Sequence, residues 1–399
     1  MERTMTEIHR YQKEREKQRA DYAVKIRRHR WKIFLRTMIV LLLLTGLIVL
    51  GITQYKRRVY TTYEVLSAEK RELVNGTQEV RLDKTILTYS KDGIHCTDSE
   101  GKMIWNQTYQ IQDVLLDICQ DVVVLASYNG REVYVANTEK ILGKFTVNLP
   151  IRNVAVSATG RVAVVMEDVD AIHYKLYTAE GKELYEGEAT MSGSGYPMAM
   201  SLSPNGELLQ ISYIYLDAGV QKNKVVFYNL GDVGANNADY IVSVHEYDDV
   251  VIPFVNFMND QTAYAVGDDR LILYTGGQKP VPLAEYTFDE EIRSVFGNDE
   301  YVGLVFYAEN ATARYMMNVY HVSGEFVGSF FFNIAYSDLL FVEEAFLVYN
   351  DAECALITLE NEVKYQGNFG KSVRMILPQK SAYKYLLVTV DGLELIQLK

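Results

Sequence analysis

Acidic side chains occur in two tight groups that could take part in acid/base chemistry. Asp248 and Asp249 form one group, and Asp289, Glu290 and Glu291 form the other. Cleavage of a glycoside uses two carboxyl groups roughly 5–10 Å apart, so these residues are candidates for an enzyme that acts on a glycan. The same charges could instead form an acidic rim that binds a basic partner, or they could simply keep exposed turns solvated.

Other residue types that support catalysis or ligand binding occur without the spacing that such sites need. The run Ser192-Gly193-Ser194-Gly195 lacks both the G-x-S-x-G pattern and the following helix of a serine hydrolase. The six His show no metal-ligand spacing, and Cys96, Cys119 and Cys354 lie in apolar, strand-like segments. We therefore expect no catalytic residue, no cofactor and no metal site.

The N-terminal part contains an apolar segment that predicts a membrane anchor. Residues 33–53 match the length of a helix that crosses a hydrocarbon layer of about 30 Å. No small-residue cleavage pattern follows, so we expect an uncleaved signal anchor in the lipid bilayer. Residues 1–32 hold eleven Lys and Arg, whereas Lys56, Arg57 and Arg58 are the basic residues just after the segment. This asymmetry predicts a cytoplasmic N-terminus and an extracytoplasmic C-terminal domain in the cell membrane.

Charge is divided unevenly between these two parts of the chain. The formal net charge is −12, from 40 Lys and Arg and 52 Asp and Glu. Residues 1–58 contribute a net of +10, which leaves −22 for residues 59–399. A domain this acidic is repelled by phosphate backbones, so the sequence excludes nucleic acid as a partner of residues 59–399.

Beyond residue 60 the pattern is that of a β-propeller. Short runs of Val, Ile, Tyr and Phe are separated by Gly-containing turns, and a unit of about forty residues recurs. The third strands of the units are expected to start near residues 93, 131, 171, 222, 269, 314, 352 and 392. The sequence therefore predicts an all-β fold, an eight-bladed propeller over residues 59–399, with seven blades as the alternative.

The last unit supplies only three strands, so the ring needs a strand from elsewhere. We expect residues 60–67 to pair with the C-terminal blade and close the ring. In a four-stranded blade, the turns between second and third strands emerge on the same face as the links between blades. Most long loops fall in these two classes: 192–196, 216–222, 247–249, 289–291 and 309–314. We expect this face to look away from the membrane, with the 231–239 loop on the opposite face.

Several segments resemble those of known propeller proteins. The run from Asp98 to Trp105 is similar to one unit of the tryptophan-docking repeats of quinone-binding propellers, although a second ectodomain Trp is missing. More specific stretches begin with Thr88-Tyr89-Ser90-Lys91-Asp92-Gly93-Ile94 and Ser203-Pro204-Asn205-Gly206-Glu207-Leu208. On these stretches the chain resembles a family of single-pass envelope proteins from anaerobic Gram-positive bacteria, catalogued as a domain of unknown function. The resemblance implies a propeller-like exported domain and no known reaction.

These observations favour a membrane-anchored extracytoplasmic propeller that serves as a binding or assembly module in the cell envelope, without catalysis. Its partner would be an envelope protein or glycan. The alternative is a hydrolase or lyase that acts on cell-envelope glycan or peptide. The candidate interaction face comprises Tyr196, Asp248, Asp249, Asp289, Glu290 and Glu291.

Overall fold

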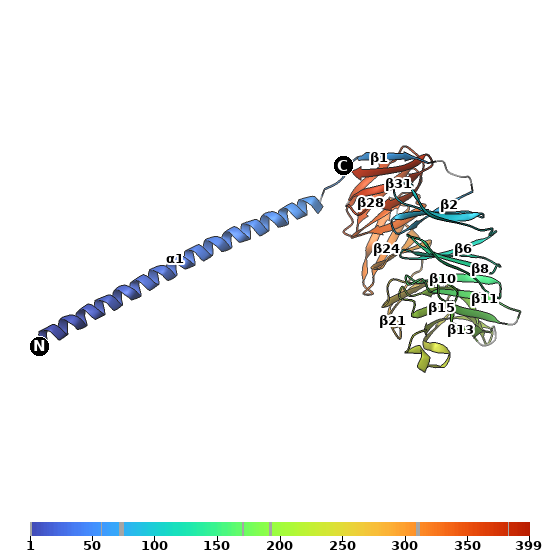
Figure 1. Cartoon of the computed structure of the whole chain (residues 1–399), viewed down its shortest axis with the longest axis horizontal. Helices are drawn as coiled ribbons and strands as arrows, with labels where there is room; N and C mark the ends of the chain where they lie inside the picture. The colour runs from blue at the N-terminus through green and yellow to red at the C-terminus, as the bar shows by residue number, and fades with distance from the viewer. Residues whose placement is uncertain are drawn as a thin grey trace. The chain divides into compact units, whose positions relative to one another are not determined.

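The computed structural model describes residues 2–56, 58–71, 76–169, 171–190, 194–308, 312–381 and 383–399, which fall in two compact units. The first unit, Met1–Val59, contains helix α1 (Glu2–Lys56) (Figure 1). Within α1 the segment His29–Gly51 has a mean hydropathy of 2.6 and no buried residue. It is long and apolar enough to cross a membrane, and it overlaps most of the predicted span 33–53.

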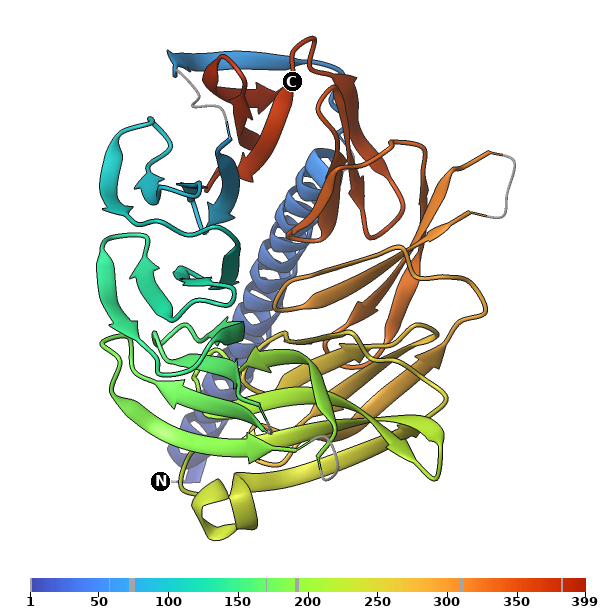
Figure 2. The ribbon, with the colours of Figure 1, turned by 90° about the vertical axis from the view of Figure 1, so that its right-hand side faces the viewer.

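The second unit, Tyr60–Lys399, is an eight-bladed β-propeller, which confirms the predicted fold (Figure 2). Every blade is a four-stranded antiparallel sheet whose first strand lies innermost. The strands of blades 1 to 4 are, in order, β2 (Gln78–Leu82), β3 (Thr85–Tyr89), β4 (Gly93–Thr97) and β5 (Met103–Thr108); β6 (Val114–Cys119), β7 (Val122–Ser127), β8 (Glu132–Asn137) and β9 (Ile141–Thr146); β10 (Ile151–Val156), β11 (Val162–Glu167), β12 (Ile172–Tyr177) and β13 (Glu183–Ala189); β14 (Tyr196–Leu202), β15 (Leu208–Asp217), β16 (Val220–Asn229) and β17 (Ile241–Asp248).

Blades 5 to 7 follow the same order, and blade 8 takes its outer strand from the start of the unit. Their strands are β18 (Phe254–Phe257), β19 (Thr262–Val266), β20 (Arg270–Thr275) and β21 (Val281–Thr287); β22 (Ser294–Gly297), β23 (Tyr301–Tyr307), β24 (Tyr315–His321) and β25 (Phe326–Phe332); β26 (Asp338–Val342), β27 (Ala345–Tyr349), β28 (Glu353–Thr358) and β29 (Val363–Asn368); β30 (Val373–Pro378), β31 (Lys384–Thr389), β32 (Gly392–Leu398) and β1 (Tyr63–Lys70).

The third strands start within two residues of the predicted positions, because turn chemistry fixes the ends of many strands. At the turn between β22 and β23, the side-chain oxygen of Asn298 accepts hydrogen bonds from the N–H groups of Glu300 (3.0 Å) and Tyr301 (2.7 Å). Asn350 does the same between β27 and β28. Such Asx turns let a short polar residue reverse the chain tightly.

The ring is closed by the pairing of β1 with β32, from Tyr63 opposite Leu398 to Lys70 opposite Gly392 (Figure 1). This strand lies three residues later than the predicted 60–67. Gly392 has φ 154°, and a Cβ there would lie 2.0 Å from the carbonyl oxygen of Glu69, so only glycine permits this approach. Just before β1, the N–H of Tyr60 donates to the carbonyl of Lys364 in blade 7.

The antiparallel order gives the propeller two distinct faces. We call the face with the second-to-third turns and the links between blades the link face, and the opposite face the turn face. Because β1 starts where β32 ends, the chain enters the propeller at the turn face. The segment between β16 and β17, with the 3-10 helices η1 (Gly234–Asn236) and η2 (Ala238–Tyr240), also lies on the turn face, as its topology predicts.

The predicted loop over residues 216–222 is wrong, because this segment is a projecting hairpin. β15 continues to Asp217 and β16 begins at Val220, opposite it. The two residues between them, Ala218 (φ 50°) and Gly219 (φ 83°), both have left-handed backbone angles. Two such residues make the turn whose twist matches a β-hairpin, so the ladder continues where a loop was expected.

The core of the propeller lies between neighbouring blades. Val124 and Val135 of blade 2, for example, pack in one cluster with Val154 and Val164 of blade 3. The indole N–H of Trp105 in blade 1 donates to the carbonyl of Asn137 in blade 2 at 2.8 Å, so this Trp joins blades as the docking-repeat resemblance implies. Each blade therefore buries its apolar faces only when its neighbours are present.

Candidate functional site

The acidic candidates lie on the link face, in two successive links. Asp248 ends the outer strand β17, and Asp249 follows it with a left-handed φ of 52° in the link to blade 5. Asp289, Glu290 and Glu291 lie in the link between β21 and β22, which joins blade 5 to blade 6. All five side chains are exposed to solvent. They are therefore placed to form a charged rim.

Basic side chains next to these links balance part of the negative charge. The ammonium group of Lys222 lies 3.4 Å from Asp248 and 3.1 Å from Asp217. The guanidinium group of Arg293 lies 3.0 Å from Glu291 and 4.9 Å from the ring centre of Tyr307. Each acidic group thus has its own basic neighbour, and the two groups do not share one.

Tyr196 lies at the link end of the channel, where β14 begins. It lines a cavity of about 260 Å³ together with Tyr128, Arg152 and Met198. Tyr128, Tyr196 and Met198 are 40%, 38% and 37% exposed. The guanidinium of Arg152 lies 5.4 Å from the ring centre of Tyr128 and pairs with Glu167. Aromatic rings, a thioether and a guanidinium thus surround one small hollow, which is a composition typical of protein contact sites.

Sequence reasoning missed three exposed apolar residues of this region: Tyr128, Met198 and Phe254. Phe254 begins β18, the inner strand next to β14, and is 37% exposed. Met198 is the extra residue of a bulge, because the pairing of β14 with β15 shifts register between Pro197 and Ala199. Tyr196 and Met198, two residues apart, are both exposed and line the same cavity. The strand pattern alone did not identify Met198 as an exposed residue.

The turn end of the channel contains a larger cavity of about 650 Å³ with an acidic lining. Asp83, Asp117, Asp121 and Asp299 all line it, and no Lys or Arg is among its lining residues. Burial raises the pKa of Asp117 to about 6, although backbone N–H groups, that of Val156 at 2.8 Å among them, favour the charged form.

The remaining nucleophilic and metal-binding residue types do not come together. In the described part of the chain, no group of three or more His, Cys, Asp or Glu is placed to hold a metal ion. Burial raises the pKa of Cys119 to about 11 and that of Cys354 to about 12, which keeps these thiols protonated at neutral pH. Ser192 and Gly193 lie outside the described residues.

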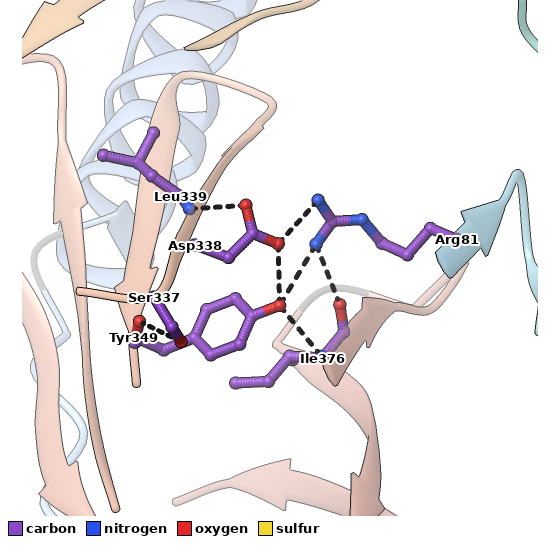
Figure 3. Close-up of polar contacts among 6 residues, drawn as sticks. All are labelled: Arg81, Ser337, Asp338, Leu339, Tyr349 and Ile376. Atoms are coloured by element: carbon purple, nitrogen blue, oxygen red, sulfur yellow. Dashed lines mark hydrogen bonds and ion pairs between the residues drawn. The ribbon is translucent and has the colours of Figure 1, made fainter. Parts of the chain in front are cut away.

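Four residues from three blades form a polar cluster that we call the clasp (Figure 3). Arg81 of β2 reaches past the inner strand of blade 8 to Asp338 of blade 7, with 2.9 Å between Nη2 and Oδ2. Tyr349 donates its hydroxyl hydrogen to the same carboxylate oxygen at 2.8 Å. Arg81 also donates to the carbonyl of Ile376 in β30 at 3.4 Å.

The clasp joins blade 1 to blades 7 and 8 at the point where the ring closes. Burial, followed by the negative charge of Asp338, raises the pKa of Tyr349, so its hydroxyl remains a donor. The sequence offers no signal for this cluster, because Arg81 is far from the other members along the chain and the four residues share no motif. Its residues are held by one another, which indicates a structural role.

We expect Arg81→Met to lower the free energy of unfolding by about 1–2 kcal/mol, since it leaves the Asp338 carboxylate with one partner fewer. The estimate is below that for a fully buried pair because the two side chains are 28% and 31% exposed. Urea denaturation of full-length protein provides the measurement. Arg293→Met, which breaks the exposed pair with Glu291, is the matched control and should leave the free energy of unfolding nearly unchanged. Equal losses of unfolding free energy in both variants would contradict a role of the clasp in closing the ring.

Comparisons with known proteins agree with this geometry. The profile of a family of unknown function (DUF5711) matches residues 56–398. Two crystal structures of Sqt1 from Chaetomium thermophilum are similar at 11% and 12% identity, with TM-scores of 0.53 and 0.51. They cover 84% and 86% of this chain and 100% and 98% of the Sqt1 chains. BamB from Moraxella catarrhalis has 11% identity and a TM-score of 0.47, over 85% of this chain and 98% of that chain. Such identities show the fold alone, and no curated protein matches the sequence.

Proposed function

The chain belongs to DUF5711, and from that premise we propose that it is a binding or assembly module of the cell envelope, without catalysis. The apolar segment of α1 would hold it in the cell membrane, with residues 1–32 in the cytoplasm and the propeller outside. The link face of blades 2 to 6 is the proposed binding surface. We define the binding centre as Tyr128, Tyr196, Met198 and Phe254, and the acidic rim as Asp248, Asp249, Asp289, Glu290 and Glu291.

The exposed apolar side chains of the binding centre carry this proposal. Tyr and Met are enriched in the centres of protein interfaces, and energetically dominant residues cluster there within a polar surround. The cavity beside Tyr128 and Tyr196 gives a partner side chain a place to insert. The acidic rim lies on links of blades in the same half of the ring, where exposed charges affect association rate and specificity more than affinity.

The direction of the chain supports the choice of face. β1 begins at the turn face, so the tethered end of the propeller is on that face. We therefore choose the link face, which is opposite the point where the chain enters the propeller, as the binding surface. We infer a protein partner with an apolar patch at its centre and basic residues around it.

Site-specific cross-linking in native envelopes tests the proposal. A photoreactive residue replaces Tyr196 in the full-length protein, and the matched control replaces Glu180, an exposed residue on the turn face. We expect one protein partner to be cross-linked from position 196 and not from position 180. Equal cross-linking from both positions would contradict the assignment of the link face.

Substitutions then separate the binding centre from the acidic rim. Tyr196→Ala combined with Met198→Ala should weaken binding of that partner by at least about tenfold, because central aromatic residues dominate interface energies. Changing the five rim carboxylates to amides should mainly slow association and reduce its salt dependence. Glu180→Gln should change neither. If purified envelope glycan, and no protein, binds the wild-type chain, the assembly proposal fails and the enzyme alternative must be tested.

A further inference from the structure

Another pocket lies between blades 3 and 4, and no residue of the binding centre or of the acidic rim lines it. Its volume is about 470 Å³, and residues from the outer two strands of blade 3 and from β16 to β17 of blade 4 line it. Four Tyr line the pocket, together with three carboxylates: Tyr174, Tyr185, Tyr228, Tyr240, Glu186, Glu188 and Asp239. No Lys or Arg is among its lining residues.

The four aromatic rings lie against one another and form the walls of this pocket. The ring centres of Tyr174 and Tyr228 are 5.1 Å apart, and those of Tyr185 and Tyr240 are 4.8 Å apart with their planes at 67°. Tyr174 and Tyr185 are 6.1 Å apart and connect the two pairs. Tyr174 and Tyr228 are only 4% and 3% exposed and belong to the core, so a small ligand in the pocket would meet mainly the half-buried rings of Tyr185 and Tyr240.

The hydroxyl groups of Tyr185 and Tyr228 are engaged with the protein. Tyr228 shares a hydrogen bond of 2.8 Å with Tyr213, a fully buried neighbour. Tyr185 donates to the backbone carbonyl of Asp239 at 3.1 Å. The rings, rather than their hydroxyls, are thus what the pocket offers to a ligand, and the negative face of an aromatic ring attracts a cation.

Carboxylates give the pocket a negative charge. The ammonium group of Lys175, the residue after Tyr174, is engaged by Glu183 at 3.1 Å and Glu186 at 2.9 Å. Glu188 and Asp239 form no ion pair within the described residues. A cation in the pocket would therefore gain from both the rings and the exposed carboxylates.

The backbone around the pocket is held in unusual conformations. Asp239 (φ 54°) and Tyr240 (φ 60°) are consecutive non-glycine residues in the left-handed region, a strained conformation that occurs often at ligand sites. On the opposite wall, a Cβ at Gly187 would lie 2.2 Å from the ring of Tyr174. The absence of a side chain at Gly187 allows this ring to lie directly on the backbone.

From these features we propose that the pocket binds a quaternary ammonium compound. A quaternary nitrogen has no N–H group that needs an acceptor, and it is held by ring faces and by nearby negative charge. A primary ammonium is more strongly hydrated and loses more on entering an aromatic site. This site does not depend on the proposed function, because none of the four residues of the binding centre lines it.

A ligand series that separates charge from shape tests the proposal. Full-length protein in a maltoside detergent is titrated with choline, with 3,3-dimethylbutan-1-ol (the uncharged analogue of the same shape), and with ethanolamine. We expect choline to bind at least about tenfold more tightly than the uncharged alcohol or ethanolamine, because cation–π interactions at a desolvated site are of that size. Phosphocholine should bind more weakly than choline, because its phosphate faces the carboxylates, and this distinguishes a free ammonium compound from a phosphate-bearing headgroup.

Variants assign the binding to this pocket. Tyr185→Leu and Tyr240→Leu keep apolar bulk and remove one ring each, so either should weaken choline binding by about fivefold or more. Tyr307→Leu removes an exposed ring on the link face and should leave binding unchanged. Thermal unfolding shows whether each variant folds. If one ring variant fails to fold, choline binding by the other ring variant tests the proposal. Absence of choline binding, equal binding of the uncharged analogue or of ethanolamine, or full binding by a folded ring variant would each overturn the proposal.

Discussion

A chain that begins at residue 71 should lose the cooperative unfolding transition that a chain beginning at residue 59 retains. The shorter chain lacks β1, so β32 becomes an exposed edge and blade 8 keeps three strands. It loses the hydrogen-bonded ladder from Tyr63 to Lys70 and the contact of Tyr60 with Lys364. The expected loss is about 5 kcal/mol or more, which is comparable to the whole stability of many domains.

Calorimetry and urea denaturation of the two chains measure this effect. A synthetic peptide of residues 59–71, added to the shorter chain, should restore part of the transition, because it can supply the missing strand in trans. A peptide of the same composition in scrambled order is the control. A shorter chain that melts as cooperatively, and at the same temperature, as the longer one would show that β1 does not hold the ring closed.

The second large effect concerns pH and Asp117. Burial raises the pKa of this carboxyl from its usual value of 3.8 to about 6 in the folded protein. Between about pH 4 and pH 6 the folded state therefore retains a proton that the unfolded state has released. The free energy of unfolding falls as pH rises through this interval, and above it the charged carboxylate destabilises the fold by about 2 kcal/mol, allowing for water in the channel.

Asp117→Asn removes this charge and should stabilise the protein at pH 7.5 by about 1–2 kcal/mol. At pH 4 the gain should disappear, because the wild-type carboxyl is then protonated. Urea denaturation of both proteins at the two pH values gives the comparison. Asp83→Asn, which removes an exposed charge from the same cavity, is the control and should show no such difference. A gain that is the same at both pH values would contradict the role of burial.

Much of the fold is predictable because it follows from short-range patterns. Gly93 and Gly392 each begin a third strand as the Gly of an Asp-Gly pair, and the spacing of such turns gives the number of blades. The prediction placed a loop over residues 216–222 and missed the hairpin at Ala218 and Gly219. The ladder continues through these residues because both central positions adopt the turn that a hairpin requires.

The sites are less predictable because they depend on contacts between distant segments. The sequence identifies charged links such as Asp289–Glu291, whose exposure needs only local information. It does not identify the clasp of Arg81 and Asp338, or the approach of Tyr240 to Tyr185, because no local pattern relates these residues. Closure of the ring determines which side chains from distant segments come into contact. The repeat pattern does not specify these contacts, because unrelated sequences can form the same fold.

The pairing of β1 with β32 also determines how the propeller responds to mechanical load. Tension that reaches the propeller through the preceding chain arrives first at Tyr60, which is bonded to Lys364, and then runs along β1 from Tyr63 toward Lys70. The hydrogen bonds between β1 and β32 lie across that direction, so tension along β1 loads them together in shear rather than opening them one after another. Opening the ring under such a load would require several of these hydrogen bonds to break together.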